Sequence, residues 1–130
     1  MRVRVLVIAG LFGVLAAHAA VAQRLTTPSP AWERSFTVSW EAFERRGQPQ
    51  LRGYVVNRYG APAAGIQLLV ESLDASGRIV AQRVEWLGGG LGPFSRRYFE
   101  VPVPQPASSY RVSVYAFDFL QAARSAARDV

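Results

Sequence analysis

The chain of 130 residues contains no cysteine and no lysine, and its only histidine is His18. The absence of cysteine excludes disulfide frameworks, cysteine-based zinc sites and cysteine nucleophiles. The absence of lysine excludes Schiff-base catalysis. Because we expect His18 to be removed with a signal peptide, the exported chain would also lack the commonest general base and the preferred nitrogen ligand of transition metals. Most familiar catalytic sites are therefore excluded.

The first 22 residues predict a secretory signal peptide. Two arginines precede an apolar run over residues 5–17, and the sequence AVA at 20–22 fits the A-x-A cleavage pattern; residues 17–19 (AHA) are a second candidate site. An uncleaved anchor is the alternative, but the strongly apolar part, at about 13 residues, is short for a membrane span. Because Arg2 and Arg4 would leave and all nine carboxylates stay, cleavage lowers the net charge from +6 to +4. We expect a periplasmic or secreted protein with no stable membrane span.

Three segments follow the signal peptide. Residues 23–34 contain two prolines and predict an extended arm or linker. Residues 35–119 show the period-two alternation of β-strands. Residues 120–130 are rich in alanine and arginine, and predict a frayed helix or a disordered tail.

The central segment predicts an all-β domain. Asp74 and Gly77 occupy the first and fourth positions of a turn, where aspartate can bond to the backbone and glycine can adopt a positive φ. The pattern predicts an antiparallel immunoglobulin-like β-sandwich of six to seven strands. The strands that we expect cover residues 35–42, 51–57, 66–73, 78–87, 94–103 and 110–119.

Part of this pattern resembles a known family. The run Leu51-x-Gly53-x-Val55-x-Asn57 is followed by an apolar strand ending at Asp74, by Gly77-x-Ile79-Val80, and by a glycine-rich loop before Phe94. Over about residues 51–118 this order resembles the FxLYD type of bacterial immunoglobulin-like domain. The resemblance implies a small extracytoplasmic β-sandwich with an adhesive or accessory role and no catalysis. It transfers no functional residues, and the naming motif, which would fall on Val70, Ser72, Leu73 and Asp74, retains only the aspartate.

Carboxylate pairs are the one catalytic possibility that the residue inventory leaves open. Glu41 with Glu44, and Glu71 with Asp74, lie near strand ends. A carboxylate-dependent hydrolase needs two such groups about 5 to 10 Å apart across a cleft. Solvated acids and a turn-capping Asp74 are the simpler interpretation. We therefore predict no catalytic residue and no cofactor. We also predict no metal site, since the residue spacing of a calcium-binding loop is absent.

Two groups of residues are candidates for binding. Arg96 and Arg97 are paired, and guanidinium groups suit carboxylates and phosphates. In the last strand, Tyr115, Phe117 and Phe119 alternate with Val112, Val114 and Ala116, so the aromatics are expected on the opposite face as an exposed patch. The alternative is that the tail from Leu120 covers Phe117 and Phe119. Trp32, Trp40 and Trp86 are expected in core or edge-strand packing.

These observations favour an exported, non-enzymatic binding or accessory module. It would contact a protein or an anionic envelope polymer through a sheet face and loops, and nucleic acid is not an expected partner of an exported protein. A small hydrolase of envelope saccharides is the alternative function. Neither charge nor periodicity specifies an oligomeric state.

Overall fold

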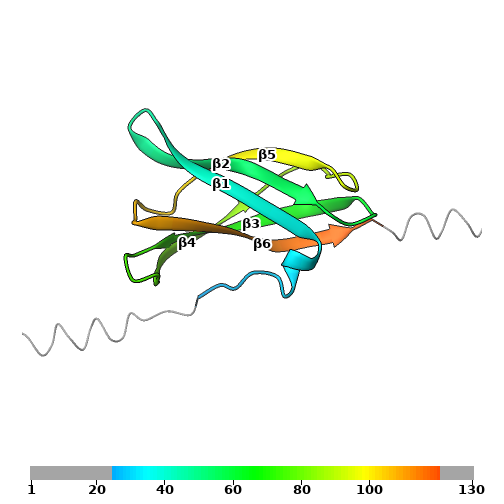
Figure 1. Ribbon diagram of the computed structural model, residues 1–130, viewed down its shortest axis with the longest axis horizontal. Coiled ribbons are helices and arrows are strands. Elements are labelled where there is room, and N and C mark those ends of the chain that lie inside the picture. Colours follow the sequence, from blue (N-terminus) through cyan, green and yellow to red (C-terminus); the bar gives the residue numbers. More distant parts are fainter. Residues whose placement is uncertain (1–24, 121–130) are drawn as a thin grey trace, which may run out of the picture.

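The computed structural model describes residues 25–120, which form six β-strands in two antiparallel three-stranded sheets (Figure 1). This part of the chain contains no α-helix, only the short 3-10 helix η2 (Trp32–Arg34). The all-β prediction is confirmed, and the two sheets are compatible with a β-sandwich. The predicted signal peptide and nearly all of the tail lie outside the described residues.

The first sheet has the order β1 (Phe36–Arg45), β2 (Gln48–Asn57), β5 (Arg96–Pro102). The second sheet has the order β4 (Ile79–Trp86), β3 (Ala63–Leu73), β6 (Ser109–Phe119).

Tight turns join β1 to β2 and β3 to β4. Arg46 and Gly47 connect β1 to β2 with φ of 53° and 77°, the positive values that a two-residue hairpin turn requires. Between β3 and β4, the Gly77 amide donates to the Asp74 carbonyl at 2.9 Å, and Gly77 has a φ of 87°. The Asp74 carboxylate accepts from the amides of Ser76 and Arg78, each at 2.9 Å. The sequence-based prediction of this turn is confirmed.

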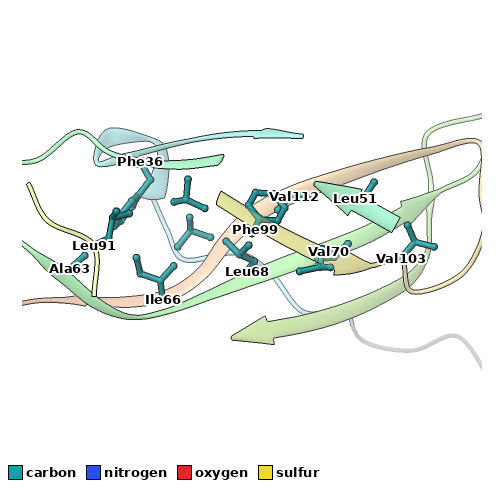
Figure 2. Packing of buried hydrophobic residues seen from close by; sticks show 13 residues of the cluster. Phe36, Leu51, Ala63, Ile66, Leu68, Val70, Leu91, Phe99, Val103 and Val112 are labelled. Atoms are coloured by element: carbon teal, nitrogen blue, oxygen red, sulfur yellow. The ribbon is translucent and has the colours of Figure 1, made fainter. Parts of the chain in front are cut away.

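The core lies between the two sheets and is almost wholly aliphatic (Figure 2). Ile66, Leu68 and Val70, which the alternation assigns to one face, are each at most 1% exposed. Burying side chains of this size stabilises the fold by about 1.5 to 3 kcal/mol each before entropy is counted. The inner face of the first sheet supplies the opposing layer, which includes Leu51, Val55, Phe99 and Val101.

Two residues of the Leu51–Asn57 run have specific structural roles. Asn57 is fully buried, and its amide nitrogen donates to the carbonyls of Ala61, Leu91 and Gly92 at 2.9, 3.2 and 3.1 Å, which connects β2 to two loops. Gly53 faces β1 so closely that a Cβ would lie 1.8 Å from the Ser39 carbonyl oxygen. Any larger residue at this position would force β1 and β2 apart.

A register shift in β6 changes which face its aromatic residues occupy. Leu68 of β3 pairs with Val114, whereas its neighbour Gln67 pairs with Ala116, so Tyr115 is an extra residue at a β-bulge. Beyond the bulge, Phe117 and Phe119 pack against the buried Phe36, with ring centroids 4.8 and 5.9 Å apart. The expectation that they lie opposite Val112 and Val114 is wrong, because strict alternation does not continue through a bulge.

The apolar residues of β4 lie on the outer face of the second sheet. Val84 pairs with Leu69, and Trp86 pairs with Gln67, which are β3 residues that point away from the core. Val84 and Trp86 are 39% and 68% exposed, and Val80, which lies where the β3–β4 register shifts, is 44% exposed. The ring of Trp86 therefore takes no part in the core.

Residues 25–29 of the N-terminal arm have no regular secondary structure, but the segment predicted as an extended arm or linker ends in a turn and η2, and it is not a free linker. The Ser29 amide donates to the Val114 carbonyl of β6 at 2.9 Å. Thr26 exchanges two backbone hydrogen bonds with the side chain of Gln82 on β4, at 3.0 and 2.7 Å. The arm thus packs along the second sheet before η2 leads into β1 (Figure 1).

Candidate binding surfaces

The outer face of the first sheet is polar, aromatic and open to solvent. It contains a shallow hollow of about 500 Å³, lined by side chains from all three strands, including Ser39, Glu41, Arg52, Tyr54 and Tyr98. Pairing of Glu41 with Arg52, and of Tyr54 with Tyr98, brings these side chains side by side. We call this surface the arginine face, and it consists of Glu41, Phe43, Arg45, Arg52, Tyr54, Arg96, Tyr98 and Glu100.

Aromatic rings support the three arginines of the arginine face. The guanidinium carbon of Arg96 lies 4.4 Å from the ring centroid of Tyr54, and that of Arg52 lies 4.6 Å from the ring of Phe43. Arg45 approaches the same phenylalanine at 5.5 Å. Such cation–π contacts orient a guanidinium group without using its N–H donors. The aromatic rings therefore hold the guanidinium groups in place and leave N–H donors available for a ligand.

Two glutamates partly neutralise the arginine face. Arg52 Nε lies 2.8 Å from Glu41 Oε1, and Arg45 lies 2.7 Å from Glu100. The hydroxyl of Tyr98 also donates to Glu100, at 2.6 Å, which lowers the pKa of Glu100, with a further contribution from Arg45. The same hydrogen bond raises the pKa of Tyr98, and the bond to Glu41 raises that of Arg52. One positive charge, on Arg96, is left uncompensated on this face.

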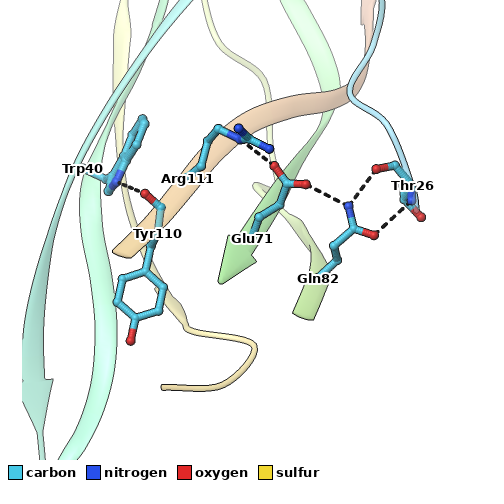
Figure 3. Close-up of polar contacts among 6 residues, drawn as sticks. All are labelled: Thr26, Trp40, Glu71, Gln82, Tyr110 and Arg111. Atoms are coloured by element: carbon cyan, nitrogen blue, oxygen red, sulfur yellow. Dashed lines mark hydrogen bonds and ion pairs between the residues drawn. The ribbon is translucent and has the colours of Figure 1, made fainter. Parts of the chain in front are cut away.

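A second concave site lies where β1 and β6 meet beside η2. It has a volume of about 430 Å³, and its lining includes Pro28, Trp32, Trp40, Glu71, Arg111 and Ser113. We call it the tryptophan groove. Trp40 is fixed there because its indole Nε1 donates to the Tyr110 carbonyl at 3.1 Å, a bond that links the two sheets (Figure 3).

A buried carboxylate lies at the base of the tryptophan groove. Glu71 is 2% exposed, and its two oxygens accept hydrogen bonds from Arg111 Nε and Gln82 Nε2, each at 2.8 Å (Figure 3). A buried charge is tolerated when it is paired and hydrogen-bonded in this way. Gln82 also bonds to Thr26, so one network connects the arm, β4, β3 and β6.

The structure does not bring the five predicted binding residues together. Arg96 and Arg97 are neighbours on β5 and point to opposite faces. Arg96 belongs to the arginine face, whereas Arg97 donates to the carbonyls of Gly88 and Gly90 and fixes the glycine-rich loop. Phe117 and Phe119 pack against the core, and Tyr115 is half-buried at the bulge.

The carboxylate pairs considered for hydrolysis lie apart. Glu41 and Glu44 are three residues apart on β1, so their side chains point to opposite faces. Glu71 is buried in its ion pair, while Asp74 is engaged in the turn, where hydrogen bonds from Ser76 and Arg78 lower its pKa. Residues 25–120 contain no group of three or more metal-ligating side chains, and no helix among them is long and apolar enough to cross a membrane.

Sequence reasoning missed the residues of the tryptophan groove. Trp32, Trp40, Glu71 and Arg111 are far apart in the chain, and only pairing of β3 with β6 brings the last two together. One signal was present, since Glu71 is a lone acid within the apolar run of β3. An acid at such a position needs a partner when it is buried.

No family model, curated protein or solved structure matches the chain. The arginine face and the tryptophan groove are therefore the features from which a function can be inferred.

Proposed function

We propose that the protein is an exported, non-enzymatic binding module whose arginine face contacts an anionic polymer of the cell envelope. The observation that carries the proposal is the support of three exposed arginines by the rings of Phe43 and Tyr54. Guanidinium groups bind carboxylates and phosphates through paired N–H donors. The aromatic support reduces the side-chain entropy that binding would otherwise remove.

The location that we propose is the periplasm or the exterior, after cleavage of a signal peptide at residues 20–22. An immunoglobulin-like class and membership of the FxLYD type are part of the same proposal. Asp74, the retained residue of that motif, caps the turn between β3 and β4, which is a structural role that an accessory domain would keep.

The shape of the arginine face favours a polymer over a small ligand. The hollow of about 500 Å³ is shallow and extends across three strands, so an extended chain can contact several arginines in succession. Each single contact is exposed and therefore weak. Repetition of anionic groups along a chain would add such contacts together.

Binding of the exported form to polygalacturonate, with uncharged dextran as the comparison polymer, tests this proposal. The charge-removing variant Arg45→Gln/Arg52→Gln/Arg96→Gln should weaken binding at least about tenfold. A matched variant elsewhere, Arg58→Gln/Arg78→Gln/Arg83→Gln, removes the same charge and should change affinity less than about threefold.

The dependence of binding on salt concentration is a second test of the proposal. Exposed charges are screened at high ionic strength, so raising sodium chloride to about 1 M should abolish the binding. Equal loss in the two triple variants would overturn the assignment to the arginine face and indicate a general effect of net charge. Equal binding to dextran would overturn the anionic partner, and capture of acidic proteins with no response to polygalacturonate would replace the polymer by a protein.

A further inference from the structure

The tryptophan groove has the size and composition of a small-ligand site. Its volume of about 430 Å³ lies within the range of known ligand pockets, which combine apolar walls with a few fixed polar groups. Trp32, Trp40 and Pro28 supply apolar walls, and Arg111 and Ser113 supply polar groups. Trp40 also lines the hollow of the arginine face, but the polar groups of the groove, Arg111 and Ser113, belong to β6 of the second sheet.

Ser113 shows that the groove has unused hydrogen-bonding capacity. Ser113 is 4% exposed. Its hydroxyl is the one buried side-chain polar atom among the described residues that has no hydrogen-bond partner. Buried hydroxyls are ordinarily paired, so an unpaired one at a pocket wall requires an explanation. Rotation of the Ser113 side chain to another staggered rotamer would turn the hydroxyl toward the groove, where a ligand hydroxyl would supply the missing partner.

Arg111 adds donors beside this hydroxyl. Its Nε is occupied by Glu71, but within residues 25–120 its two Nη groups have no recorded hydrogen bond, and the side chain is 49% exposed. Figure 3 shows Arg111 between Glu71 and Trp40. The buried carboxylate thus orients the guanidinium group and leaves its outer edge free for a ligand.

The balance of charge selects the class of ligand. Glu71 neutralises Arg111, and Glu33 adds a further carboxylate to the groove, which disfavours an anion. The Nη groups of Arg111 are donors only, so they pair with a hydroxyl oxygen and not with an ammonium group, which also has donors only. A pyranose ring has an apolar C–H face that stacks on indole and a rim of hydroxyls that pair with Ser113 and Arg111. We infer that the tryptophan groove binds a neutral oligosaccharide.

The groove is preorganised for such a ligand. The Trp40 indole is held by its bond to Tyr110, and Trp32 packs against the hydrophobic core. Pro28, which also lines the groove, belongs to the arm that Gln82 fixes through Thr26. Walls that are already in place reduce the entropy lost on binding.

The test is titration of the exported protein with maltotriose, cellotriose and N-acetylchitotriose, followed by calorimetry and tryptophan fluorescence. At least one of these neutral sugars should bind at concentrations up to about 10 mM, with little change at about 1 M salt. Trp32→Ala should weaken this binding at least about tenfold. Trp86→Ala is the matched control, since that indole is exposed on β4, and it should leave the affinity unchanged.

The variant Ser113→Ala tests sugar binding without destabilising the fold. Because the hydroxyl has no partner, its removal should leave the Tm unchanged or raise it, while sugar affinity falls about threefold to tenfold. Absence of binding by all three sugars would overturn the inference, as would affinity that is unaffected by Ser113→Ala. Occupation of the groove by a proline-rich peptide, with no response to sugars, would assign it to a peptide instead.

Discussion

On the outer face of each sheet, a glutamate and an arginine that are direct cross-strand partners form an ion pair, and the two pairs have the same Nε–Oε1 distance. Arg52 Nε lies 2.8 Å from Glu41 Oε1, and Arg111 Nε lies 2.8 Å from Glu71 Oε1. Their surroundings differ, since the Glu41 side chain is 66% exposed and that of Glu71 is 3% exposed. The arm and Gln82 pack over the second pair, whereas no segment among the described residues covers the first.

The same residue types therefore have different roles on the two faces. On the open arginine face, an ion pair adds little stability and keeps its groups available to a partner. On the covered face, the pair is part of the fold, since removal of Arg111 leaves the buried Glu71 carboxylate without its charged partner, and removal of Glu71 leaves Gln82 and Arg111 without their acceptor. Burial, and not the distance between the atoms, separates these roles.

Removal of the two glutamates should show this difference most strongly. Glu71→Ala deprives Arg111 and Gln82 of their acceptor and should lower the free energy of unfolding by about 2 kcal/mol, with Arg111 partly rehydrated. Glu41→Ala breaks an exposed pair and should lower it by less than about 0.5 kcal/mol. Urea denaturation of both variants measures the two values. Equal losses of unfolding free energy in the two variants would contradict the claim that burial makes the Glu71–Arg111 pair more important for stability than the exposed pair.

A smaller effect is expected when the arm is released from the second sheet. Gln82→Ala removes two hydrogen bonds to Thr26 and one to Glu71, and should cost about 1 kcal/mol. Faster hydrogen exchange at the Thr26 amide should accompany the loss. Gln50→Ala, on the outer face of the first sheet, is the control and should alter neither quantity. Unchanged exchange in Gln82→Ala would mean that other contacts hold the arm.

The smallest effect concerns acid titration of the arginine face. Tyr98 and Arg45 lower the pKa of Glu100 below its ordinary value of 4.5. The resulting stabilisation is present above that value and is lost as the pH falls through the lowered pKa. Tyr98→Phe removes the hydroxyl donor, so the pKa of Glu100 should rise toward 4.5, as carboxyl NMR titration can measure. A pKa that stays the same in this variant would contradict the assigned cause.

Local patterns in the chain were sufficient for much of the fold. Alternation over residues 66–73 places Ile66, Leu68 and Val70 on one face, which is the face that the core buries, and Asp74 with Gly77 predicts the hairpin turn. Both features depend on neighbours within a few positions, where steric limits on φ and side-chain periodicity act directly. Prediction from sequence therefore succeeds for features that depend on residues close together in the chain.

Alternation was misleading where pairing between strands intervened. The extra residue at Tyr115 reverses the faces of Phe117 and Phe119, and the bulge that causes the reversal is a property of the β3–β6 register. The hydrophobic pattern of β6 alone is equally consistent with either arrangement.

The absence of cysteine, lysine and, after the expected cleavage, histidine narrows the chemistry of this protein without any coordinates, because a missing functional group cannot be supplied by folding. The two candidate binding surfaces depend on the fold instead. Trp32, Glu71 and Arg111 meet because β3 pairs with β6 and the arm returns across the second sheet. Such contacts join residues that are distant in the chain, and their energies depend on burial, which exists only once the sheets have packed.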